Sequence, residues 1–135
     1  MVPYDKNDVR KTLLGHMGQV AEDLKKLASA KDSKAAVFPG SWANEEGVVT
    51  AYAGYHPRNG GYGNGIEVLM SLVPTDNEVH FMADIYGSDG RRIRRISRAP
   101  LQSKSGDELK AEVNSLCQWA GEQVRQHLKE GLLEF

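Results

Sequence analysis

Apolar residues recur every three or four positions in two stretches, one near each end of the chain. This spacing places them along one face of an α-helix, so it predicts amphipathic helices over residues 5–30 and over the stretch after residue 105. The apolar positions are Val9, Leu13, Met17, Val20, Leu24 and Leu27 in the first stretch, and Leu109, Val113, Leu116, Ala120, Val124 and Leu128 in the second. Each predicted helix therefore has one face to bury.

Polar residues mark the ends of both predicted helices. Asp5 or Asn7 can cap the first helix, because a short polar side chain accepts hydrogen bonds from the free N–H groups of the first turn. Ser105 and Glu108 form an S-x-x-E capping box at the start of the second helix, and Gly131 is a suitable stop.

Between the helices the pattern is typical of β-strands. Residues 47–55, 66–73 and 78–86 are rich in apolar, β-branched or aromatic residues and predict three strands. The stretch 78–86 alternates apolar with other residues, whereas 66–73 is nearly all apolar, which favours a central strand covered on both faces. Residues 31–47 contain a Pro-Gly pair and predict a connector.

A turn over residues 87–90 leads into a predicted fourth strand over 91–98. A three-residue hairpin loop pairs Gly87 with Arg91 and places Ile93 beside Ile85 on the core side. On the other side of the sheet, the strand 78–86 faces the new strand residue by residue. Tyr86, Asp84, Met82 and His80 then lie opposite Arg92, Arg94, Ile96 and Arg98, respectively. A two-residue loop shifts this register by one position and turns Ile93 outward.

These elements predict an α+β fold. The N-terminal and C-terminal helices pack on one face of a four-stranded antiparallel meander sheet, because both apolar stripes need a surface to cover. The side of strand 78–86 that carries Val79, Phe81, Ala83 and Ile85 supplies that surface. A chain of 135 residues predicts a single domain over 1–135.

The charges are balanced overall but unevenly placed. The chain has 17 basic and 18 acidic residues, and residues 91–104 hold six of the basic ones and no acid. A near-neutral whole argues against general DNA binding. Apolar runs of only a few residues exclude a membrane span, and an N-terminus without an apolar leader indicates a cytoplasmic protein.

The basic strand is the first candidate site. Arg92, Arg94 and Arg98 share a sheet face with Tyr86 in the predicted register, and guanidinium groups with an aromatic ring suit an acidic protein surface or an anionic ligand. Two structural interpretations stay open. Charge on an edge strand prevents aggregation, and Asp84 can neutralise Arg94 across the sheet.

The glycine-rich stretch 54–65 is the second candidate site. Its G-x-G spacing leads into a strand, which excludes the dinucleotide-binding motif because that motif needs a helix N-terminus. The stretch holds Arg58 and Tyr62, and mixtures of Tyr, Gly and Asn serve as adaptable contact surfaces. A flexible loop tip without a function is the alternative.

No arrangement of residues predicts catalysis, a metal or a cofactor. The histidines are scattered without metal-ligand spacing. Cys117 lies in the middle of a predicted helix, beside its apolar stripe, which favours an inert buried thiol. Trp42 and Trp119 are expected in the core. The histidine positions are His16, His56, His80 and His127.

The sequence favours a small non-catalytic protein-binding module, an inhibitor, immunity-type or adaptor protein, that acts through an exposed sheet face and the Gly/Tyr-rich loop. Many small bacterial or phage proteins share this build, which is an analogy of fold. One alternative is an anion-binding module for a nucleotide or nucleic-acid strand. The order of helix, sheet and helix is also similar to that of secretion chaperones that hold effectors on a dimeric sheet, although the helix expected between the third and fourth strands is missing. A homodimer is thus a further possible assembly.

Overall fold

The computed structural model describes residues 4–31, 36–56, 66–87, 92–97, 100–101 and 106–129. Two helices enclose five strands in chain order. They are α1 (Lys6–Lys31), β1 (Ala36–Ala43), β2 (Val49–His56), β3 (Ile66–Pro74), β4 (Val79–Tyr86), β5 (Arg92–Ser97) and α2 (Gly106–Lys129).

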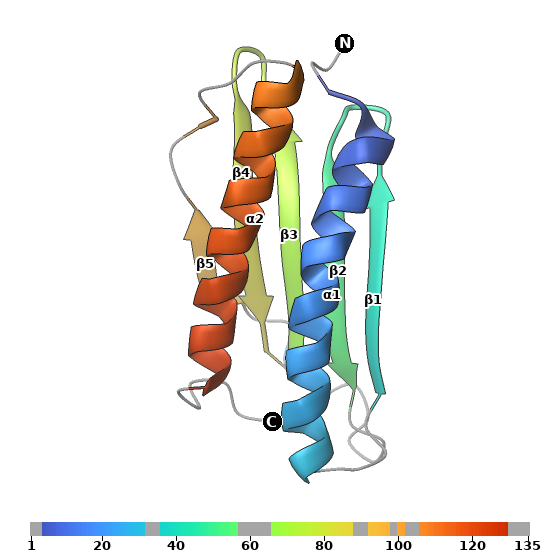
Figure 1. The fold of residues 1–135 in the computed structure, drawn as a ribbon, viewed down its shortest axis with the longest axis vertical. Coiled ribbons are helices and arrows are strands. Elements are labelled where there is room, and N and C mark those ends of the chain that lie inside the picture. The colour runs from blue at the N-terminus through green and yellow to red at the C-terminus, as the bar shows by residue number, and fades with distance from the viewer. Residues whose placement is uncertain are drawn as a thin grey trace.

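The strands form one antiparallel sheet in the order β1-β2-β3-β4-β5, and each strand pairs with the next strand along the chain. Both helices lie side by side on one face of this sheet, with their amino-terminal ends at the same end of the molecule (Figure 1). α1 packs on β1 and β2, and α2 packs on β4 and β5. The predicted α+β fold with two helices on one face of an antiparallel meander is confirmed, with five strands rather than four.

The hydrophobic core lies between the helices and the sheet. The predicted stripes of both helices are buried, including Leu13, Met17, Leu24, Val113 and Val124. Each such side chain contributes about 1.5–3 kcal/mol by leaving water. The side chains of Leu27 and Leu128 lie outside the described residues. The sheet contributes the alternate residues of its inner face: Val49, Ala51, Ala53, Ile66, Val68, Met70, Leu72, Val79, Phe81, Ala83, Ile85 and Ile96.

Asp5 caps α1, as one of the two predicted candidates. Its Oδ1 accepts hydrogen bonds from the backbone N–H groups of Asn7 at 2.8 Å and Asp8 at 3.3 Å. These bonds satisfy donors that have no partner inside the helix. The predicted capping box at Ser105 and the stop at Gly131 lie outside the described residues.

The first turns of α1 are tied to the turn between β1 and β2. The hydroxyl of Tyr4 donates to the carbonyl of Gly47, and Lys6 Nζ donates to the carbonyl of Asn44 at 3.1 Å. One turn further along α1, the guanidinium of Arg10 donates to Ser41 in β1. The helix is thus held to β1 by polar contacts as well as by its apolar stripe.

The prediction of a connector over residues 31–47 was wrong in its middle, because Ala36–Ala43 form β1. Pro39 and Gly40 interrupt the sequence pattern, yet both lie inside the strand, paired with Ala53 and Tyr52. β1 is an edge strand, and an edge accommodates a proline because one side of its backbone has no strand to bond with.

The predicted register between β4 and β5 was wrong for most of β5. Arg92 pairs with Tyr86 as predicted, but the next pair joins Arg94 to Ile85 at a β-bulge, so Ile93 is one extra residue on β5. The rest of the strand is shifted by one position. Arg95 and not Arg94 opposes Asp84, and Ile96 opposes Ala83 in the core, where it is only 5% exposed.

Gly40 allows the ring of Tyr52 to lie across β1, because a β-carbon at Gly40 would overlap the phenol ring and its hydroxyl. We expect Gly40→Ala to lower the free energy of unfolding by about 1–2 kcal/mol, since the ring must move away. Denaturant unfolding measures this loss, and in a Tyr52→Ala background the loss should largely disappear.

Gly15→Ala in α1 is the matched control. A β-carbon there meets no atom within 4 Å, so the substitution should stabilise the helix by about 0.5–1 kcal/mol. Equal effects of the two glycine substitutions would contradict the packing of Tyr52 over Gly40.

Candidate functional site

The face of the sheet opposite the helices, here called the outer face, has no covering element among the described residues (Figure 1). Strand pairing and alternation place the following residues on it: Phe38, Gly40 and Trp42 from β1; Thr50, Tyr52 and Gly54 from β2; Glu67, Leu69, Ser71 and Val73 from β3; His80, Met82, Asp84 and Tyr86 from β4; and Arg95 and Ser97 from β5.

Aromatic side chains project from the β1 side of the outer face. Phe38 is 58% exposed and Trp42 is 45% exposed, and the ring of Tyr52 lies over Gly40 between them. Within the described residues, the other exposed large hydrophobic side chain is Leu14 on α1. The prediction that Trp42 lies in the core was wrong. Trp119 is partly buried against the core, as expected.

The middle of the outer face is apolar with one internal polar pair. Leu69, Val73 and Met82 are half-buried, and the hydroxyls of Thr50 and Ser71 share a hydrogen bond of 2.9 Å. β3 is the central strand, as its composition predicted. However, only its inner face is fully buried in this structure.

Asp84 and Arg95 form an ion pair across β4 and β5. Arg95 donates from Nε to Oδ1 of Asp84 at 2.8 Å and from a terminal nitrogen to Oδ2 at 3.2 Å, which is the bidentate geometry that strengthens such pairs. The hydrogen bond to Asp84 raises the pKa of Arg95 above its ordinary value. The sequence predicted this neutralisation for Arg94, and the bulge transfers it to Arg95.

The predicted site residues are only partly described. Tyr86 is half-buried on the outer face and pairs with Arg92 in the neighbouring strand. Arg94 lies in β5, but the side chains of Arg92 and Arg94 are outside the described residues. So are Arg58, Tyr62 and Arg98. The structure thus brings Tyr86 and the backbone of Arg92 together.

Sequence reasoning missed Phe38 and Trp42. The available signal was their spacing of four residues on either side of a glycine, which puts both on the same face of a strand. The Pro-Gly pair concealed this signal because it is usually a sign of a turn.

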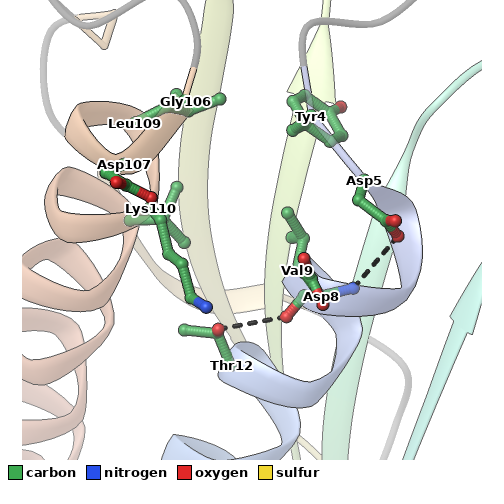
Figure 2. A pocket seen from close by; sticks show the side chains of 10 residues that line it. Tyr4, Asp5, Asp8, Val9, Thr12, Gly106, Asp107, Leu109 and Lys110 are labelled. Atoms are coloured by element: carbon green, nitrogen blue, oxygen red, sulfur yellow. Dashed lines mark hydrogen bonds between the residues drawn. The ribbon is translucent and has the colours of Figure 1, made fainter.

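A separate cavity of about 260 Å³ lies between the first turns of α1 and α2 (Figure 2). Lys110 extends from α2 toward Thr12 of α1 in this view. The acidic residues that line this cavity lie at the starts of the two helices. Asp5 caps α1, and Asp8 and Asp107 lie in first turns, where negative charge is stabilising. The complete lining is Tyr4, Asp5, Asp8, Val9, Thr12, Gly106, Asp107, Leu109, Lys110 and Val113.

Three titratable side chains outside the ion pair, those of Tyr4, His80 and His16, each contact another group of the protein. Burial raises the pKa of the Tyr4 phenol to about 12, so it stays neutral while it donates to the carbonyl of Gly47. His80 Nε2 lies 3.1 Å from an oxygen of Glu78, and His16 Nε2 lies 2.7 Å from Oδ1 of Asn114. Within the part of the chain that the structure describes, no group of three His, Cys, Asp or Glu residues is arranged to hold a metal ion.

The chain matches no protein-family model, no curated protein and no solved structure. Neither helix of the described chain combines the length and apolar character needed to cross a membrane. The arguments on function therefore rest on the residues of this chain alone.

The thiol of Cys117 is buried, and burial raises its pKa to about 12. Because the pKa is raised, the reactive thiolate should appear only as the pH approaches this value, not near the ordinary 8.5 or so of cysteine. We expect a chromogenic thiol reagent to leave the folded protein unmodified at pH 8 and to modify one thiol per chain in denaturant. Stoichiometric modification of the folded protein would contradict this.

Substituting either member of the ion pair should lower the free energy of unfolding, and the two losses should not be additive. The Asp84 side chain is only 10% exposed and that of Arg95 is 42% exposed, so solvent screens one partner. A double-mutant cycle with Asp84→Asn and Arg95→Met should give a coupling of about 1 kcal/mol in denaturant unfolding. If the two losses simply add, the pair contributes nothing.

Proposed function

We propose that this protein is a small non-catalytic protein-binding module of the inhibitor, immunity-type or adaptor class, and that its outer face contacts the partner. The observation that carries the proposal is the exposure of Phe38 and Trp42 on one open sheet face. Large aromatic side chains are enriched at protein interfaces and at their energetic hot spots, because they bury much area with little conformational freedom to lose.

The polar groups of the outer face support a partner that covers it. Thr50 bonds to Ser71, and Asp84 bonds to Arg95, so these groups keep hydrogen bonds when water is removed. A buried polar group is costly only where it loses its partner. The face combines apolar area with internally satisfied polar groups, and such a surface suits another protein better than a small solute.

The same ion pair engages Arg95 alone, so it lowers the charge that the basic strand offers to an anion but leaves the predicted anion-site residues untested. A guanidinium that already donates two hydrogen bonds to a carboxylate has less charge and fewer donors for a phosphate. The anion hypothesis then depends on Arg58, Arg92, Arg94 and Arg98. An acidic patch on the protein partner, opposite this basic strand, stays part of our proposal, as does a cytoplasmic location.

The test is capture of a partner from the native source by immobilised protein. Trp42→Ser should weaken the binding of the captured protein about 30-fold or more, the effect of losing a hot spot of about 2 kcal/mol. Leu14→Ser is the matched control, because Leu14 is also exposed but lies on α1. Quantitative mass spectrometry of the captured proteins, followed by titration of the purified partner, measures the difference.

Equal capture by the two variants would remove the outer face from the proposal. Loss of the partner from Leu14→Ser alone would point to α1 instead of the sheet.

A further inference from the structure

We infer that a second copy of this chain covers the outer face, in a symmetric dimer packed sheet against sheet. This inference rests on the proposed function, since it takes the same outer face as a protein-binding surface, and it names a second copy as the occupant in place of a foreign protein with an acidic patch. Four features of the face support a second copy as the occupant: its charge, its area, the composition of its central strand and the complementarity of its two edges.

The charge of the outer face is compatible with itself. In a twofold interface the same patch meets itself, so an unpaired charge near the axis would repel its own copy. Asp84 and Arg95 neutralise each other within one chain. The exposed Glu67 lies near the end of β3, at the margin of the face, where water can still solvate it.

The area of the face is sufficient for a stable dimer. Five strands about 4.8 Å apart, most of eight or nine residues at about 3.3 Å each, span roughly 600 Å² of geometric area. Two such faces bury roughly 1,200 Å² in total, which is the lower end of the range for specific, stable interfaces.

The composition of β3 fits two covering layers. Two of its four outer residues, Leu69 and Val73, are apolar, where a strand with one solvated face usually has polar residues. α1 packs on the inner side of β3, and Gly121 of α2 lies close to the side chain of Met70 on the same side. A second sheet, about 10 Å away, covers the outer side and completes a helix–sheet–sheet–helix sandwich.

The two edges of the face also complement each other. Aromatic residues lie on β1, and the cation Arg95 lies on β5 at the opposite edge. A twofold axis parallel to the strands places β1 of one copy across from β5 of the other. Trp42 then approaches the partner's β5 edge, where the planar guanidinium of Arg95 can stack on the indole ring while it keeps its hydrogen bonds to Asp84.

The first experiment measures the mass of the purified 135-residue chain by light scattering and sedimentation over a range of concentrations. We expect a dimer with a dissociation constant of about micromolar or tighter. The double variant Phe38→Ser, Trp42→Ser should be monomeric, with at least about 30-fold weaker association. Leu14→Ser should remain dimeric, and circular dichroism should show that all three proteins are folded.

The second experiment locates the contact with single cysteines. Ser71 lies on the central strand of the outer face, so Ser71→Cys should be joined to its own copy by a thiol crosslinker spanning about 10 Å. Ser115→Cys is the matched control, since Ser115 is exposed on α2. The native Cys117 is buried and should not react. Crosslinking of Ser115→Cys alone would overturn the inference, because the dimer would then use the helices.

The outcomes separate this inference from the proposed function. A chain that is monomeric at every concentration overturns the inference, while Trp42-dependent capture of a foreign protein by that monomer would still support the function. A dimer that dissolves on substitution of Phe38 and Trp42 supports the inference even if no foreign partner is found. A monomer that captures nothing removes both.

Discussion

Burial of the two helix stripes against one face of the sheet is the interaction on which the rest of the structure depends. α1 covers the β1 side and α2 covers the β4 and β5 side, so the inner residues of the sheet are removed from water. Because both helices are used on that face, the described chain has no element left for the other. The chemistry of the outer face, with its aromatic edge and its internally paired polar groups, follows from this division.

Sequence periodicity was sufficient for the elements with a regular pattern. The helices and four of the five strands were predicted close to their observed bounds, because an apolar stripe, an apolar run or, for β5, the turn before it identifies each of them. β1 was missed because its interior holds Pro39 and Gly40. Pro39 fits because β1 is an edge strand, and Gly40 leaves room for the ring of Tyr52; neither reason can be seen in the local sequence.

The candidate site was harder to predict from the sequence than the fold, because it depends on the register between β4 and β5. A single bulge at Ile93 moves Ile96 into the core and brings Arg95 instead of Arg94 to Asp84. Several arginines in a row make neighbouring registers nearly equivalent in composition, so tertiary packing around Ile96 decides between them. The residues proposed to contact a partner therefore change from the arginines of β5 to the aromatic residues of β1 at the opposite edge. The roles of Arg58, Tyr62 and Arg98 stay predictions.

The order of the strands has a consequence for how the chain folds. Each strand pairs with its neighbour in sequence, so the sheet can form as successive local hairpins, which close quickly. The contact between the helices is different, because the hydrogen bond between His16 and Asn114 joins residues 98 positions apart. During synthesis α2 emerges after the five strands, and until its 24 residues dock, part of the inner face stays open. A nascent or shortened chain thus exposes apolar residues on both sides of the sheet, and it is in that state, rather than as the finished fold, that the protein is most prone to aggregate.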